Sequence, residues 1–186
     1  MQKNSFLTPS ELETIGFQSV GQSVQISRNA VFYNPQNVSV GDNTRIDDQV
    51  VISAGSQVKI GRYVHLSLGV SILGKGGVTI EDFVSVSVKT SIFSSNDDYS
   101  GAYMTNPTVP GHLTNVDSGL VQIRKHVIIG AHCVILPHSD LGAESAYGAL
   151  SLMKGKYESN AIYAGSPAKK IGVRQNTCEK LSEELS

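Results

Sequence analysis

An all-β fold, in which the chain winds as a stack of three-sided coils, is predicted by three features of this sequence. Large apolar residues recur at steps of 6, 6 and 8 over residues 20–92, and in plain sixes over residues 123–147. A smaller residue recurs four positions after many of these, as at Val24 and Val64. Glycine often follows the large residue directly, as at Gly61.

The six-residue period excludes both common alternatives. A helix needs a period near 3.6, and a single amphipathic strand needs a period of 2. A short strand followed by a tight corner fits a six-residue unit with two inward positions. Three such units close one triangular coil, and the stacked coils share a narrow core. An ordinary β-sandwich would instead show irregular strand spacing.

The two ends of the chain are predicted to cap this stack, because terminal repeats need a polar outer face. In residues 1–19, Thr8-Pro9-Ser10-Glu11 has the pattern of a helix start, with Thr8 as N-cap and Glu11 reaching back. Residues 20–174 are assigned to the coils and residues 175–186 to a short helical tail. The whole chain, 1–186, is expected to be one domain.

The regular spacing is interrupted by "SIFSSNDDYSGAYMTNP", residues 91–107, and resumes at Ile123. We therefore predict a loop extruded from the stack over about residues 95–119. Loops of this length are uncommon in compact domains unless they are functional or disordered. The Asn96-Asp97-Asp98 segment is also typical of a solvated turn.

Composition and charge exclude several classes of function. The formal net charge is −1 and no long basic run is present, which disfavours nucleic acid as a partner. No stretch reaches the roughly 18 apolar residues of a membrane span, and the N-terminus lacks the apolar region of a secretory signal. The two cysteines have no CxxC spacing. A cytoplasmic protein without membrane partners is expected.

The histidines do not form a metal-binding pattern. His126, His132 and His138 are spaced six and six, so they fall on three successive faces of the coil and point about 120° apart. Zinc needs converging ligands. His65 and His112 lie elsewhere and have no supporting motif, so no metal is expected.

The hexads resemble those of the left-handed β-helix acyltransferases, the hexapeptide-repeat family, from about Val20 to Arg174. The most specific part is "IRKHVIIGAHCVILPHSDLGAESAYGALSLM" together with "IYAGSPAKKI", which carries the family's element Gly165-Ser166-Pro167-Ala168-Lys169. The resemblance implies a left-handed parallel β-helix, a homotrimer with sites between subunits, and acyl-CoA as co-substrate. It implies no permanently bound cofactor.

The resemblance also places residues along the coenzyme A. In related galactoside, maltose and xenobiotic acetyltransferases, pantetheine lies along one edge of the prism. Matching this chain to that segment implies that backbone at the corners holds the pantetheine, and that nearby cations hold the phosphates. The implied residues are Gly130, Ala131, Gly148, Ala149, Lys154, Lys169 and Arg174.

Aligning "IFSSNDDY" with the galactoside-type enzymes puts Asp97 where they carry a catalytic histidine. A neutral histidine suits an alcohol, whose proton needs a base poised near neutrality. An amine attacks while neutral and loses its proton only afterwards, from a much more acidic nitrogen. A carboxylate, with an ordinary pKa near 3.9, is an adequate acceptor for that proton. The aspartate therefore favours an amino group as acceptor.

The segment "DFVSVSVKTSIFSSNDDYSGAYMTNPTVP" resembles the branch that N-acylates nucleotide-linked amino sugars for surface polysaccharides. This implies transfer of an acetyl or other short acyl group by direct attack of the amine on the thioester. Asp97 would be the base or the amine anchor, and Ser87 its hydrogen-bonding partner. The residues implied to contact substrate are Asn96, Asp98, Tyr99 and His126.

Two other functions stay open on the sequence. An O-acetyltransferase acting on a sugar or polysaccharide hydroxyl would use His65 as its base. A non-catalytic structural β-helix would show a repeated threonine ladder and no extruded loop, and the threonines here form no ladder.

The repeat predicts a measurable effect at its inward positions. Replacing Ile60 or Ile80 with Asp would bury an unpaired carboxylate between stacked coils, which costs several kcal/mol out of a typical total of about 5–15 kcal/mol. We expect a large fall in Tm, or an unfolded chain, by circular dichroism. An unchanged Tm would show that the register assigned to the repeat is wrong.

Overall fold

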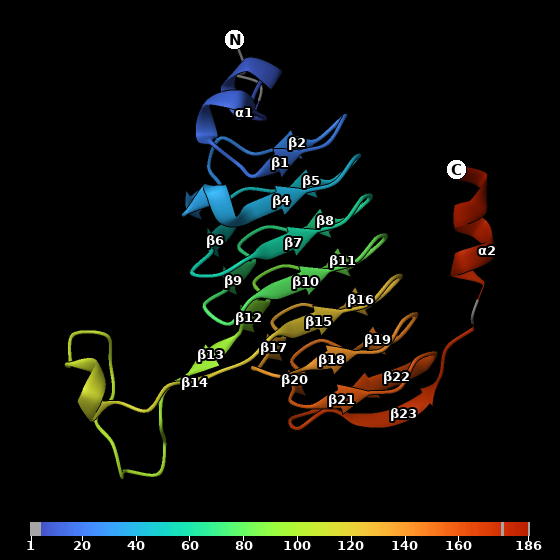
Figure 1. Cartoon of the computed structure of the whole chain (residues 1–186). Helices are drawn as coiled ribbons and strands as arrows, with labels where there is room; N and C mark the ends of the chain where they lie inside the picture. Colours follow the sequence, from blue (N-terminus) through green and yellow to red (C-terminus); the bar gives the residue numbers. More distant parts are fainter. Residues whose placement is uncertain (1–4, 176, 186) are drawn as a thin grey trace.

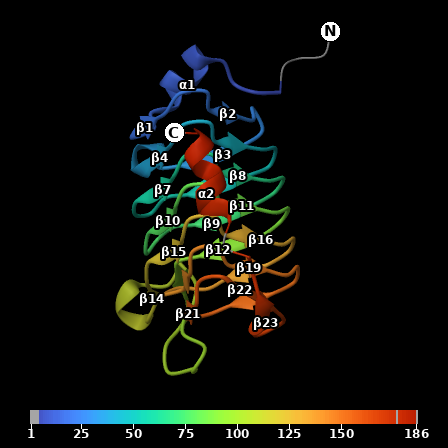
Figure 2. The same cartoon turned by 90° about the vertical axis from the view of Figure 1, so that its right-hand side faces the viewer.

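The computed structural model describes residues 5–175 and 177–185, and its chain winds as a left-handed parallel β-helix with three flat faces (Figure 1). The predicted fold class is confirmed. Each coil contributes one short strand to each face, and the strands of one face pair with the coils before and after. Figure 2 shows the same stack turned by 90°, with the helix α1 at the N-terminal end.

The strands divide among the three faces in chain order. The first face contains β1 Ser19–Val20, β4 Val38–Val40, β7 Val58–Ile60, β10 Val78–Ile80, β15 Val121–Ile123, β18 Asp140–Leu141 and β21 Lys156–Tyr157. The second contains β2 Gln25–Ile26, β5 Arg45–Ile46, β8 His65–Leu66, β11 Ser85–Val86, β16 Ile128–Ile129, β19 Ala146–Tyr147, β22 Ala161–Ala164 and β23 Lys169–Val173. The third contains β3 Val31–Tyr33, β6 Val51–Ser53, β9 Ser71–Leu73, β12 Ser91–Phe93, β17 Val134–Ile135 and β20 Leu152–Met153.

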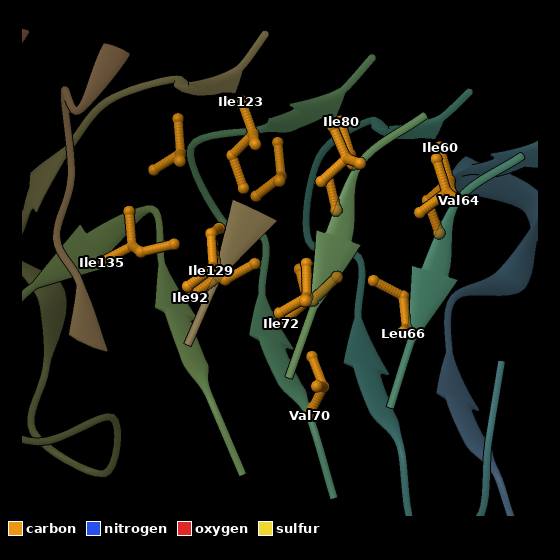
Figure 3. Packing of buried hydrophobic residues seen from close by; sticks show 14 of the residues in the cluster. Ile60, Val64, Leu66, Val70, Ile72, Ile80, Ile92, Ile123, Ile129 and Ile135 are labelled. Atoms are coloured by element: carbon orange, nitrogen blue, oxygen red, sulfur yellow. The ribbon is translucent and has the colours of Figure 1, made fainter. Parts of the chain in front are cut away.

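The inward residues stack in columns along the axis of the prism (Figure 3). On the first face Ile60 pairs with Ile80, and Ile80 with Ile123; on the third face Ile72 pairs with Ile92. All five are at most 3% exposed. Burying one such side chain contributes about 1.5–3 kcal/mol, and no single coil holds enough of them to fold alone. Stacking is therefore what makes the core.

The corners require left-handed backbone, and several of them are not glycine. Tyr63, Phe83 and His126 follow one another down the corner between the first and second faces, with φ of 55°, 61° and 60°. Their rings stack, with centroids 5.1 Å and then 4.9 Å apart. A left-handed residue with a Cβ costs roughly 1–2 kcal/mol, and ring stacking contributes about 0.5–1.5 kcal/mol in the opposite direction.

The N-terminal helix α1 Pro9–Ile15 begins as the sequence predicts. Thr8 and Glu11 form the complete capping box, and Leu12 is buried at the end of the core. Both carboxylate oxygens of Glu11 also accept hydrogen bonds from Arg28, at 2.5 and 2.7 Å, which ties the helix to the first coil. Residues 1–4 of the predicted cap lie outside the described residues.

The C-terminal end differs from a simple continuation of the coils to residue 174. β22 is the last parallel strand of the second face, and β23 returns antiparallel to it. The reversal follows Gly165, whose φ of +103° reverses the chain, and Pro167, which has no N–H for a ladder. α2 Cys178–Ser182 and a 3₁₀ turn at Glu183–Leu185 then lie alongside the stack (Figures 1 and 2). Residues 176 and 186 of the predicted tail lie outside the described residues.

The extruded loop leaves and re-enters the stack at one corner, between the third and first faces. Its root is a two-stranded antiparallel pair, β13 Ser95–Asn96 with β14 Asp117–Ser118, and it contains the 3₁₀ turn Gly111–Leu113. The coil resumes in register, since Ile80 on β10 pairs directly with Ile123 on β15. The predicted boundaries, 95–119, match this geometry.

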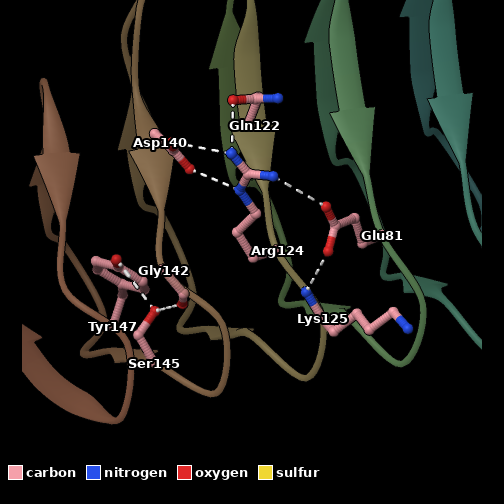
Figure 4. A network of polar contacts seen from close by, with 8 residues as sticks. All are labelled: Glu81, Gln122, Arg124, Lys125, Asp140, Gly142, Ser145 and Tyr147. Atoms are coloured by element: carbon pink, nitrogen blue, oxygen red, sulfur yellow. Dashed lines mark hydrogen bonds and ion pairs between the residues drawn. The ribbon is translucent and has the colours of Figure 1, made fainter.

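A polar network fixes the point of re-entry (Figure 4). The Arg124 guanidinium donates to Asp140 on the next coil at 2.9 and 3.1 Å, and to Glu81 on the preceding coil at 3.3 Å. The other oxygen of Glu81 accepts from the Lys125 N–H at 3.0 Å. These hydrogen bonds raise the pKa of Arg124, chiefly through Asp140. Three coils are thereby joined across the inserted loop.

None of the helices in the described part of the chain is long and apolar enough to cross a membrane.

The N-terminal cap predicts a pH-dependent stability. Hydrogen bonds from Arg28, then from Thr8, lower the pKa of Glu11 from 4.5 to about 2. A carboxyl whose pKa is lowered on folding stabilises the fold above its unfolded value, and that contribution disappears as the pH falls from 4.5 toward 2. Glu11→Gln should lower the Tm at pH 7, and the difference from wild type should shrink between pH 4.5 and 3. Differential scanning calorimetry of both proteins at pH 7, 4.5 and 3 would measure this difference in Tm. A difference that does not change with pH would contradict the role assigned to the Glu11 carboxylate.

Candidate active site

A cavity of about 850 Å³ lies between the third face and the extruded loop, which is within the usual size range of ligand sites. The third face and the corners beside it supply Ser53, Gly55, Leu73, Gly74, Lys75 and Phe93. The loop and its root supply Ser95, Asn96, Asp97, Asn106, Pro107, Val109, Gly111, Thr114 and Val116. The loop therefore forms a wall that the flat prism lacks.

The two adjacent acids of the loop have different environments. Asp97 is exposed, lines the cavity, and its carboxylate makes no hydrogen bond or ion pair with any described residue. Asp98 accepts from the Ser100 N–H at 2.7 Å, from the Ser100 hydroxyl at 2.5 Å and from Asn115 at 3.2 Å. These bonds, first those from Ser100, lower the pKa of Asp98. Asp98 thus shapes the turn, and Asp97 is free for a ligand.

The neighbours of Asp97 are placed by the root of the loop. Asn96 lines the cavity and pairs with Asp117 across the two-stranded root. The Asp117 carboxylate in turn accepts a hydrogen bond from the ring of His138, with 2.8 Å between Oδ1 and Nε2. Tyr99, by contrast, is 87% exposed and lies outside the cavity lining.

The predicted pantetheine residues gather on one edge, where the second face turns into the third. Gly130-Ala131 follow β16 and Gly148-Ala149 follow β19, one coil apart. A Cβ on Gly130 would lie 2.5 Å from the Ala149 nitrogen, so the close stacking requires glycine there. The amide N–H groups of Ala131 and Ala149 donate to no acceptor among the described residues, which leaves them for a bound chain of amides.

Ser87 stands on the same edge, one coil above Gly130. It follows β11, and its N–H donates to the Ile129 carbonyl at 2.9 Å. A ligand that lies along this edge past Gly148 and Gly130 therefore reaches Ser87 next. The structure brings Ser87 together with four of the residues predicted to hold the cofactor.

The three predicted phosphate-binding cations lie in different places. Lys169 is exposed at the start of β23, directly after the turn at Gly165 that ends this edge. Lys154 follows β20 and lies at the corner between the third and first faces. Arg174 donates to the carbonyls of His126 and Ser145 at 2.8 and 3.2 Å, at the corner between the first and second faces. Of the three, Lys169 is beside the edge.

His65 and His126 are also remote from the cavity. His65 lies on the second face, and its Nε2 is 2.7 Å from Asp47, which Arg45 also contacts. His126 is 8% exposed and stacks on Phe83, and this burial lowers its pKa.

His126, His132 and His138 fall between successive strands at three different corners. No three His, Cys, Asp or Glu side chains among the described residues are arranged to hold a metal ion.

Ser87 and Asp97 lie at opposite ends of the third face. Ser87 precedes β12 and Asp97 follows it, so one side of the triangle separates them. An extended side of six residues spans on the order of 20 Å. One amino group cannot reach both residues within a single chain.

A left-handed β-helix with an extruded loop and a glycine-lined edge is the architecture of the hexapeptide-repeat acyltransferases, which use acyl-CoA. The comparisons with known proteins agree, although no family model matches the chain. It is 47% identical over 171 residues to the dTDP-4-amino-4,6-dideoxy-D-glucose acyltransferase of Escherichia coli, covering 91% of this chain and 89% of that protein. It is 27% identical over 133 residues to the galactoside O-acetyltransferase of Escherichia coli K12, covering 72% and 62%.

Solved structures of AntD, an N-acyltransferase from Bacillus cereus, superpose closely. One, with dTDP-4-amino-4,6-dideoxyglucose and coenzyme A, is 39% identical with a TM-score of 0.95, covering 99% of this chain and 98% of that one. Another, with dTDP and 3-hydroxybutyryl-CoA, is 40% identical with a TM-score of 0.94, covering 98% and 96%. The chain belongs to the hexapeptide-repeat acyltransferases, in the branch of the nucleotide-linked amino-sugar N-acyltransferases. The predicted class is confirmed over the O-acetyltransferase alternative.

One cavity residue that the sequence reasoning missed, Lys75, could have been found from the spacing of the repeat. The three steps of 8 in the repeat, at 32–40, 52–60 and 72–80, all fall at the corner between the third and first faces. The extruded loop leaves at the same corner one coil later. The longer corners therefore mark the edge that the cavity uses, and Lys75 lies on the last of them.

Proposed function

We propose that this enzyme transfers a short acyl group from acyl-CoA to the 4-amino group of dTDP-4-amino-4,6-dideoxyglucose or a sugar of the same kind. The observation that carries the proposal is the Asp97 carboxylate, which lines a cavity of suitable size without a partner among the described residues. Two of the relatives support this choice of substrate: the Escherichia coli acyltransferase is named for this sugar, and one AntD structure contains it.

The chemistry follows from an amine as nucleophile. The neutral nitrogen attacks the thioester carbonyl carbon, the carbon–sulfur bond breaks, and the electron pair leaves with the coenzyme A sulfur. The nitrogen, which has become cationic, gives its proton to Asp97, and that proton passes to the thiolate or to water. Before attack, the same carboxylate holds the amine by a charge-assisted hydrogen bond. One residue thus serves as anchor and then as base.

Ser87 is proposed to contact the reacting acyl or amino group, because the glycine edge leads to it from the pantetheine residues. The solved forms of AntD lend support. They include variants of one serine and one aspartate that stand ten positions apart, and Ser87 and Asp97 have the same spacing.

A homotrimer is proposed because the two halves of the site lie at opposite ends of the third face. A neighbouring copy can present its Ser87 edge to the Asp97 cavity, and cyclic symmetry repeats that contact until the ring closes. Lys169 is proposed to meet the phosphates of coenzyme A, because it lies where the edge ends. A cytoplasmic location is also proposed for the protein, since both described cysteines are free thiols.

The first test is an assay of the wild-type enzyme with dTDP-4-amino-4,6-dideoxyglucose and either acetyl-CoA or 3-hydroxybutyryl-CoA. The release of the coenzyme A thiol measures the reaction. With that activity in hand, Asp97→Asn keeps the shape but removes the base, so kcat should fall by roughly 10² or more. The KM for acyl-CoA should change little. Asp98→Asn is the matched control, because its side chain serves the turn, and its kcat should stay near wild type.

Two outcomes would revise the role of Asp97. A raised KM for the sugar with kcat nearly kept would make Asp97 an anchor alone. If Asp97→Asn retained wild-type kcat and KM, the proposal that this carboxylate carries the reaction would be lost.

The shared site can be tested by complementation. Ser87→Ala and Asp97→Asn subunits, each nearly inactive alone, should recover activity when co-expressed at equal levels with separate purification tags. In a cyclic trimer of randomly mixed subunits, about a quarter of the interfaces combine an intact Ser87 with an intact Asp97. Purified homotrimers mixed without exchange are the control. No recovery in the mixed trimers would place both residues in one subunit's site.

A further inference from the structure

The cavity carries one charge of each sign. Among the described residues that line it, Lys75 is the one cation and Asp97 the one acid. The Lys75 side chain is exposed and makes no hydrogen bond or ion pair with any described residue, Asp97 included. Two unpaired, opposite charges at one cavity point to a ligand that is itself charged at two places.

The corner that carries Lys75 is held firmly against the root of the loop. The buried Ser94 hydroxyl accepts from the Gly76 N–H at 2.8 Å and donates to the Leu73 carbonyl at 3.0 Å. A Cβ on Gly76 would lie 2.4 Å from the Ser94 carbonyl oxygen and 2.7 Å from the Gly119 nitrogen. The backbone beside Lys75 is thus packed against the residues that directly precede β13 and follow β14. Asp97 follows Ser94 by three residues, so the packing around Ser94 holds the backbone near both Lys75 and Asp97.

The space around the two charges is largely apolar. Leu73 and Phe93 lie on the third face, and Pro107, Val109 and Val116 come from the loop. Leu73 is 42% exposed although it is aliphatic, so its surface is available to a ligand. Apolar walls with a few placed polar groups are typical of small-molecule sites.

A nucleotide-linked amino sugar has the matching distribution of charge. Its amine donates hydrogen bonds and is cationic when protonated, although it attacks in its neutral form; its diphosphate is anionic, and one sugar ring separates the two groups. Asp97 fits the amine, which leaves Lys75 for the phosphates, where lysine acts as a flexible point charge.

We propose that Lys75 binds the diphosphate of the acceptor substrate and, with Asp97, fixes the orientation of the sugar in the cavity. This rests on the proposed function for the identity of the acceptor. Lys75 takes no part in the transfer of the acyl group. It is a binding residue, and its loss should weaken the acceptor complex without changing the chemical step.

The test compares Lys75→Gln with wild type by isothermal titration calorimetry, using dTDP and then thymidine as probes. We expect the Kd of dTDP to rise about tenfold or more, because a charge-assisted bond is lost. The Kd of thymidine, which has no phosphate, should be the same for both proteins. Lys75→Arg should bind dTDP within a few-fold of wild type. Lys59→Gln, an exposed lysine of the first face outside the cavity, is the matched control and should not change either affinity.

Kinetics on the acceptor sugar separate binding from chemistry. Lys75→Gln should raise the KM for the nucleotide-linked sugar by a similar factor, with kcat and the KM for acyl-CoA nearly unchanged. Equal dTDP affinity in wild type and Lys75→Gln would overturn the inference while the proposed function stands. An equal loss in Lys59→Gln would also overturn it, since the effect would then be general charge. If wild type bound dTDP through Lys75 but did not acylate the amino sugar, the proposed function would fail instead.

Discussion

The constraint on which the rest of this structure depends is the strict register between one coil and the next. Parallel strands pair residue for residue, so Ile60, Ile80 and Ile123 stack although 20 and then 43 positions separate them. The backbone hydrogen bonds that join one coil to the next support this alignment, and so do the columns of aliphatic side chains. Since no coil has a sufficient core alone, a slip at one level would misplace every inward residue beyond it. That cost is why the repeat is so regular.

The register restricts chemistry to the corners and the loop. Face residues alternate between the core and a flat outer surface, which cannot enclose a ligand. Corners are different, because glycines such as Gly130 bring successive coils close and leave outward amide groups free. Corners also cost energy where a bulky residue is left-handed, and the stacked rings of Tyr63, Phe83 and His126 offset part of that cost. The prism thus offers edges for elongated ligands.

The extruded loop supplies the enclosing wall that the edges of the prism lack. The fold can accommodate the loop because the two ends of the loop meet. β13 and β14 pair at the root, and Arg124 joins the coils on both sides of the insertion. Closing a long loop costs little more entropy than closing a short one, so the length of the loop is not a thermodynamic obstacle. The loop carries Asp97 directly after β13, while Ser87 lies on the edge at the far end of the face. In the proposed function, an assembled site therefore combines the Asp97 cavity of one copy with the Ser87 edge of a second.

The sequence by itself determined the coil, its columns, the capping box at Thr8 and Glu11, and the limits of the loop, because each depends on spacing or on neighbours in the chain. Counting hexads onward from Gly148 would also have placed Lys154 one corner further along. Only the tertiary structure decided that Asp98 is held by Ser100 and Asn115 while Asp97 is free, and that Lys75 shares a cavity with Asp97. The physical reason is that a period specifies which side of a strand faces the core. It does not specify which side chains meet across a loop that leaves the repeat.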